Sequence, residues 1–180
     1  MVFGFFKKDK KEEPDVNDLV LPKLQPGYLV DYDMRTFQVA ARNRYHWEDG
    51  GDSDEWELKE GDDTWFLERS EDDGYVEWTM SQKFPISDLE GNIPEHVGKH
   101  EDPPEKVKYQ DKEFHYEDDD IGEYFRGDAK EGLKFIVWDY ESEDGEELLS
   151  IEQWGEIKFD LTVGYTVEEY QFTNILPGGH

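Results

Sequence analysis

The chain has 180 residues, which is enough for one domain with a real core or for two small units packed together. It carries 47 acidic against 19 basic residues, a formal net charge of −28, so its surface repels nucleic acid and attracts cations, basic proteins or polyamines. Cysteine is absent, which excludes disulfides, thiolate catalysis and cysteine-ligated zinc.

Residues 1–25 are predicted to form a flexible tail, because prolines break the segment and no periodicity runs through it. The tail opens on an apolar and basic cluster, which predicts a weak tether to an anionic membrane or to a partner groove. A terminus without any role is the alternative. The residues of this tether are Phe3, Phe5, Phe6, Lys7, Lys8, Lys10 and Lys11.

No apolar run in the sequence approaches the ~20 residues of a membrane span. The opening apolar stretch is also too short for a signal peptide, and its lysines follow it instead of preceding it. We therefore expect a cytoplasmic protein, with any membrane contact peripheral and at the inner face.

From residue 28 onward, apolar and polar residues alternate in short runs, which is typical of strands with one solvated face. The clearest run covers residues 157–163, whereas residues 133–140 are apolar on both faces and predict a central, doubly covered strand. Glycine-containing turns separate the runs, and helical periodicity is limited to single turns. We predict an all-β, antiparallel fold with very little helix.

The two halves of the chain resemble each other at a fixed offset. Val30 matches Val107, and Phe37 matches Phe114, while residues 90–106 between the halves are rich in proline and glycine. This pattern predicts two related β-units, residues 26–89 and 107–178, packed as a pseudo-duplicated sandwich or as small barrels within one compact body. Chance similarity between two acidic, aromatic segments is the alternative.

Several tryptophan-containing blocks carry a likeness to a known family. The segments "EWELKEGDDTWFLE" and "LLSIEQWGEIKFDL", followed by "ILPG" near the end, resemble the bacterial family catalogued as domain of unknown function 4178. The likeness runs from about residue 24 to residue 178. The resemblance implies a gene that lies near those of polyamine-biosynthesis enzymes and small membrane proteins, and it implies no activity or catalytic residue.

Two acidic runs are candidate cation sites, because carboxylates on alternate loop residues can chelate a hard cation. Neither run has the glycine and distal glutamate of an EF-hand, so the prediction is weak, nonspecific binding. The residues are Asp49, Asp52, Asp54, Asp118, Asp119 and Asp120. His96 and His100 have the spacing of two ligands on one helix face, but their surroundings look too irregular for a helix, so we predict no metal site and no cofactor.

The sequence contains no nucleophile elbow, phosphate loop or zincin motif. We therefore expect a non-enzymatic module whose acidic surface receives a cationic partner, either a basic protein or a polyamine. The alternative is a hydrolase or carbohydrate-active enzyme that uses paired carboxylates in an aromatic cleft. An enzyme needs a concave pocket where acids with shifted pKa values approach one another, whereas an interaction module needs acids on a flat or convex face.

Overall fold

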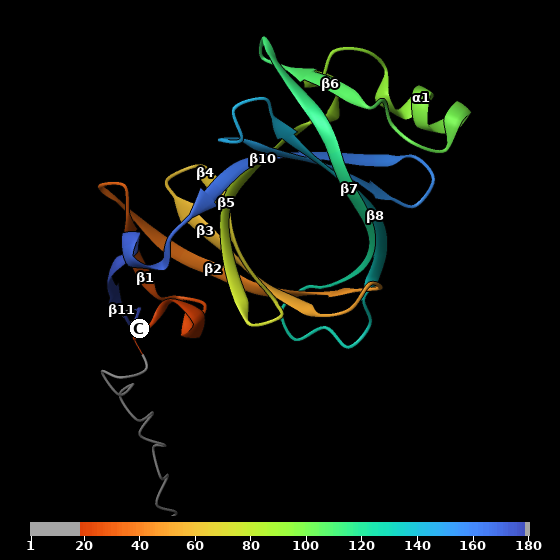
Figure 1. Cartoon of the computed structure of the whole chain (residues 1–180). Helices are drawn as coiled ribbons and strands as arrows, with labels where there is room; N and C mark the ends of the chain where they lie inside the picture. The colour runs from red at the N-terminus through yellow and green to blue at the C-terminus, as the bar shows by residue number, and fades with distance from the viewer. Residues whose placement is uncertain (1–18, 179–180) are drawn as a thin grey trace, which may run out of the picture.

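The computed structural model describes residues 19–178 as one antiparallel sheet that closes on itself (Figure 1). The prediction of an all-β antiparallel fold with very little helix is confirmed. In these residues the eleven strands are β1 (Leu29–Tyr32), β2 (Arg35–Trp47), β3 (Asp52–Glu60), β4 (Asp63–Asp72), β5 (Tyr75–Pro85), β6 (Lys106–Tyr109), β7 (Lys112–Phe125), β8 (Leu133–Ser142), β9 (Leu148–Trp154), β10 (Lys158–Val167) and β11 (Thr173–Leu176). The same residues form one α-helix, α1 (Ile93–His100), and the 3-10 turns η2 (Leu21–Lys23), which precedes β1, η3 (Ile86–Asp88) and η4 (Glu169–Gln171).

The sheet closes because two long strands meet. The strand order is β11-β1-β2-β3-β4-β5-β10-β9-β8-β7-β6, and residues 44–47 of β2 also pair with residues 122–125 of β7. Eight strands, β2 to β5 and β7 to β10, therefore form a closed barrel. The register shifts within β2 and β7, and such bulges bend a strand so that it can change partners along its length.

The first half of the chain contributes β1 to β5 as consecutive strands of the sheet, and the second contributes β6 to β10 as consecutive strands and β11, which pairs with β1. Val30 lies opposite Phe37 in the first half, and Val107 lies opposite Phe114 in the second, so the residues of the sequence match occupy equivalent pairs. Strands of the two halves are nevertheless hydrogen-bonded to each other on both sides, β2 with β7 and β5 with β10. The internal duplication stays a prediction, and the strands of both halves together make one barrel.

Two apolar cores lie on the outer face of the barrel wall. One packs side chains of β2 to β5 beneath η2 and β1, and includes Leu24, Trp56 and Met80. The other packs β8 to β10 beneath α1 and β6, and includes Val97 and Trp138. Figure 1 looks along the barrel, with β1 and β11 outside it on one side and β6 and α1 outside it on another. The strands beyond the barrel thus cover its apolar exterior.

A third, aromatic cluster lies inside, where β2 meets β7. Tyr45 stacks on Trp47 with ring centroids 5.4 Å apart, and Phe135 stacks on Trp154 at 4.5 Å. Gly122 makes room for these rings, since a Cβ there would lie 2.5 Å from the Phe135 ring and 2.9 Å from Trp47. Aromatic packing therefore fills the lumen along the β2–β7 closure.

The expectation that residues around His96 are too irregular for a helix is wrong. Residues 93–100 form α1, whose N-cap is Asn92: its side chain accepts a hydrogen bond from the backbone of Glu95. Ile93 and Val97 anchor the helix in the second outer core. Within residues 19–178, no helix has the length and apolar character needed to cross a membrane.

Candidate functional site

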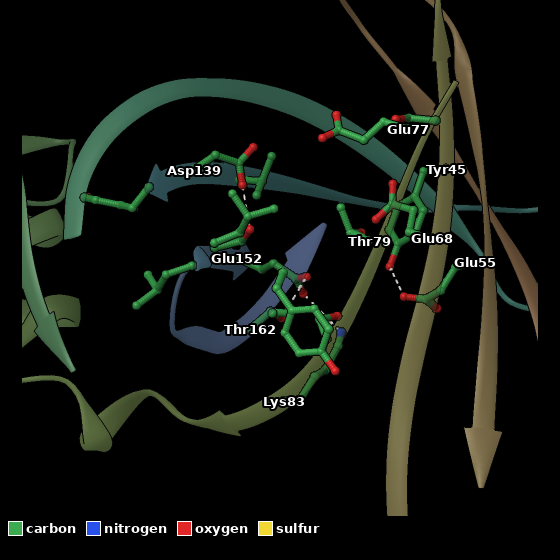
Figure 2. Close-up of a pocket in the computed structure, with 18 of the residues that line it drawn as sticks. Tyr45, Glu55, Glu68, Glu77, Thr79, Lys83, Asp139, Glu152 and Thr162 are labelled. Atoms are coloured by element: carbon green, nitrogen blue, oxygen red, sulfur yellow. Dashed lines mark hydrogen bonds and ion pairs between the residues drawn. The ribbon is translucent and has the colours of Figure 1, made fainter. Parts of the chain in front are cut away.

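Away from the aromatic cluster, polar side chains line much of the barrel interior, because alternation along β3 to β5 turns their apolar residues outward. On β3, Trp56 belongs to the first outer core and its neighbour Glu55 faces the lumen. On β4, Leu67 likewise belongs to the outer core and Glu68 faces the lumen. The lumen holds a cavity of about 320 Å³. Figure 2 shows its labelled carboxylates around a shared space. The charged residues that line it are Glu55, Glu68, Glu77, Lys83, Asp139 and Glu152.

Glu55 is the most enclosed of these carboxylates, with 4% of its surface exposed. One oxygen accepts a hydrogen bond from Asn43 Nδ2 at 2.8 Å, and the other accepts one from the Tyr45 hydroxyl at 2.8 Å. Burial raises the pKa of Glu55, while these two donors and the charge of Lys83 oppose the rise. Burial, with the charge of Glu55 beside it, also raises the pKa of Tyr45 well above its usual value, so the phenol stays a donor.

Glu68 has fewer partners. Ser53 Oγ donates to its Oε1 at 2.6 Å, and Trp47 Nε1 donates to Ser53 Oγ at 3.1 Å, so a short relay leads back to the aromatic cluster. Burial raises the pKa of Glu68 to about 8, and the negative charges of Glu55, Asp139 and Glu152 add to the rise that Ser53 opposes. Glu68 therefore keeps its proton at neutral pH when the lumen holds no ligand.

Among the residues that the structure describes, Lys83 is the one basic residue that lines the cavity, and it is already paired. Its Nζ lies 3.2 Å from Glu152 Oε2, and 5.3 and 5.9 Å from the ring centroids of Phe66 and Trp154. Trp154 Nε1 donates to the same carboxylate at 3.1 Å. Burial opposes the charge of Lys83, but the attraction of Glu152 and Glu55 outweighs it and raises the pKa of the amine. The lumen thus contains one complete ammonium site, filled by the protein itself.

Asp139 projects from β8 and accepts a hydrogen bond from Ser150 Oγ at 2.6 Å. Protein surrounds Asp139, but its side chain remains accessible to solvent through the cavity and through a second hollow that adjoins it. Burial within the barrel raises the pKa of Asp139 to about 6, and the charges of Glu152, Asp118 and Asp120 contribute. At neutral pH Asp139 is therefore mostly ionised.

A second hollow, of about 490 Å³, adjoins the lumen and shares Trp47, Ser70, Val137 and Asp139 with it. We call it the mouth. Acidic residues dominate its lining, which brings five of the six cation-site residues predicted from the sequence to one end of the barrel. The acidic residues of the mouth other than Asp139 are Asp49, Asp52, Glu71, Asp72, Asp118, Asp119 and Asp120.

Asp54, the sixth predicted residue, is placed elsewhere: it pairs with Arg42, Nη2 to Oδ1 at 2.9 Å, on the exposed exterior. His96 and His100 lie together on α1 with ring centroids 4.4 Å apart. Across residues 19–178, no three histidine or carboxylate side chains gather in a way that could hold a metal ion. The proposed tether, Phe3 to Lys11, lies outside the described residues.

Sequence reasoning missed the lumen residues Glu55, Glu68, Asp139, Glu152 and Lys83. Their signal was present, since Asp139 interrupts the most apolar strand and Glu55 precedes a tryptophan in an alternating run. With 47 acidic residues in the chain, however, the sequence offered no reason to prefer these over the others.

Comparison with known proteins places this architecture in a family. The family model described as a domain of unknown function, DUF4178, matches residues 25–169, which include every strand of the barrel. The chain belongs to this family. It is also 26% identical over 173 residues to an uncharacterized protein of Aquifex aeolicus (strain VF5), an alignment that covers 96% of this chain and 94% of the relative. No solved structure matches the DUF4178 chain significantly.

Proposed function

We propose that the lumen binds a small organic cation, such as a polyamine, that enters through the acidic mouth. One observation carries the proposal: five carboxylates and one lysine line the cavity, and that lysine is already paired with Glu152. Carboxylates enclosed by protein are costly without a counter-ion. A ligand ammonium supplies the missing positive charge to Glu68 and Asp139, each of which has a hydroxyl as its side-chain donor.

The shape of the site favours a small ligand over a basic protein. A cavity of about 320 Å³ is at the lower end of the range for small-molecule pockets, and a folded partner cannot enter it. The acids of the mouth lie on the approach to the cavity, where like charges in a concave site attract cations and raise their association rate. A basic protein would instead contact the mouth from outside.

Calorimetric titration with spermidine, at low and at physiological salt, tests the proposal. We expect one saturable site that persists at physiological salt, because charges inside a barrel are screened less than surface charges. An oligolysine peptide too wide for the barrel serves as the comparison. Spermidine binding that disappears at physiological salt, or oligolysine binding that matches it, would contradict a lumen site.

Matched carboxyl-to-amide variants locate the binding. Asp139→Asn should weaken spermidine binding at least tenfold, since it removes the ionised carboxylate shared by lumen and mouth. Asp54→Asn removes the same charge from the exterior and should leave affinity within twofold. Equal losses of spermidine affinity in the two variants would mean that binding depends on the net charge of the protein and not on the lumen.

One observation favours the alternative of a hydrolase: Glu68 keeps a proton at neutral pH, as a general acid must. Against it, both oxygens of Glu55 and of Glu152 accept hydrogen bonds from protein side chains, which leaves fewer carboxylates for paired acid–base work. Incubation with neutral oligosaccharides separates the alternatives. Reducing ends released by the wild type and not by Glu68→Gln would support the hydrolase.

A further inference from the structure

We propose that the lumen exchanges a proton for its ligand: entry of a cation drives the proton off Glu68, so that binding releases one proton to solvent. This inference rests on the proposed function and adds the way in which the site is regulated. The step is balanced, because a neutral carboxyl and a ligand ammonium become a carboxylate–ammonium pair and a free proton. No other reactant takes part.

The hydrogen bonds of Glu68 set up this exchange. Within residues 19–178, Ser53 Oγ is the one side-chain donor that reaches the Glu68 carboxyl, on Oε1. Glu55 differs in having a donor on each oxygen, and Glu152 differs in having Lys83. Glu68 thus lies in the cavity with an oxygen still free to meet a ligand.

The groups around Glu68 leave its charge uncompensated. Acidic or phenolic side chains face it from the neighbouring elements, and the one cation among them is held by Glu152. The charged and titratable groups that share the lumen with Glu68 are Tyr45 of β2, Glu55 of β3, Glu77 and Lys83 of β5, Asp139 and Tyr140 of β8, Glu152 of β9 and Tyr165 of β10. An incoming ammonium therefore supplies the counter-charge that residues 19–178 do not provide.

The two least satisfied carboxylates then have different roles. The pKa of Asp139 is about 6 and that of Glu68 is about 8, both raised chiefly by burial. Near pH 7 Asp139 is mostly ionised and attracts the ligand from the mouth, whereas Glu68 is mostly protonated and ionises once the ligand is in place. Proton release then comes from Glu68, and it fades above pH 8, where Glu68 is already ionised.

The experiment is a calorimetric titration at pH 7 with 1,4-diaminobutane, repeated in buffers of different ionisation enthalpy. Its primary amines stay charged over the range used, since alkyl ammonium groups titrate near ~10. We expect release of about one proton per ligand and an affinity about tenfold higher at pH 7.5 than at pH 6.5, as one titrating group requires. A pH-indicator dye measures the same release with the wild-type protein alone.

Two variants identify the group that releases the proton. Glu68→Gln should bind with a release near zero and with an affinity that changes by less than about twofold between pH 6.5 and 7.5, since Asp139 is already mostly ionised there, while Asp54→Asn should keep both effects. Wild-type binding without proton release would overturn the exchange and leave the proposed function standing. Proton release that persists in Glu68→Gln would also overturn it, because another group would then supply the proton. A complete absence of binding would overturn the proposed function itself.

Discussion

Glu55 and Trp56 are neighbours on β3, and both are almost completely enclosed, yet they lie in opposite environments. Trp56 packs against Trp78 in the first outer core, with ring centroids 5.6 Å apart. Glu55 projects into a lumen shared with other carboxylates. The barrel wall thus has an apolar outer face, and an inner face that carries carboxylates beside the aromatic cluster of the β2–β7 closure. This division leaves the lumen free for binding.

The largest effect on stability is expected from a substitution in the core on the outer face of the barrel. Trp56→Ala should lower the free energy of unfolding by about 3–5 kcal/mol, because it empties a fully buried site and removes the hydrogen bond from the indole to the Leu24 carbonyl. Urea denaturation measures the loss. Tyr75→Ala, at a ring that is 74% exposed, is the control and should change stability by less than ~0.5 kcal/mol. Similar losses in both variants would contradict the assignment of the outer core.

A smaller effect is expected where the inner face is packed. Gly122→Ala places a methyl group against Phe135 and Trp47, and should destabilise the fold by about 1–3 kcal/mol. Gly98→Ala is the matched control, since nothing lies within 4 Å of a Cβ there and alanine favours a helix by up to ~1 kcal/mol. Thermal unfolding of both variants checks the sign. A neutral Gly122→Ala would mean that the aromatic cluster does not fix the closure of the barrel.

A substitution in the lumen should raise the stability of the fold instead of lowering it. The pKa of Glu68 is raised to about 8 in the folded protein, above the ordinary value of 4.5 for a glutamate, so below pH 4.5 both states hold the proton. As pH rises toward 8, the unfolded chain loses its proton more readily and stability falls. Glu68→Gln should therefore stabilise the protein at pH 8 by at least ~1 kcal/mol, with little effect at pH 4, since each pKa unit corresponds to ~1.4 kcal/mol.

Thermal melts of the wild type, Glu68→Gln and Asp54→Asn at pH 4, 6 and 8 test this sign. The exterior variant Asp54→Asn should not reproduce the stabilisation, because Asp54 already has Arg42 as its partner. A Glu68→Gln variant that is less stable than the wild type at pH 8 would show that the carboxylate is ionised and favourable in the lumen.

The smallest expected effect is that of salt on the unfolding temperature, which depends on the charge of the whole surface. A net charge of −28 repels itself most at low ionic strength, so the unfolding temperature should rise by a few degrees as salt is added. The wild type and the neutralised variant Glu68→Gln should respond alike, since Glu68 lies inside and holds its proton. No change between low and moderate ionic strength would mean that the exterior charges are already compensated.

The sequence by itself determined the antiparallel all-β class, because alternation with period two and glycine turns are local signals. It also indicated the acidic character and the family, and five of the six aspartates that it picked out as cation-site candidates line the mouth. Asp54 shows the limit of this reading: it shares a strand face with Asp52, but it lies two residues further along β3, where it pairs with Arg42 on the exterior and does not line the mouth.

Only the tertiary structure decided which face of each strand became the inside. Alternation separates two faces without saying which one is enclosed, and an acidic face reads as solvated until the strands close around it. Closure depends on β2 meeting β7, a contact between residues 44–47 and 122–125 that no local pattern records. Once that contact forms, the strands beyond the barrel cover its apolar exterior and the carboxylates are enclosed together, where burial changes their pKa values.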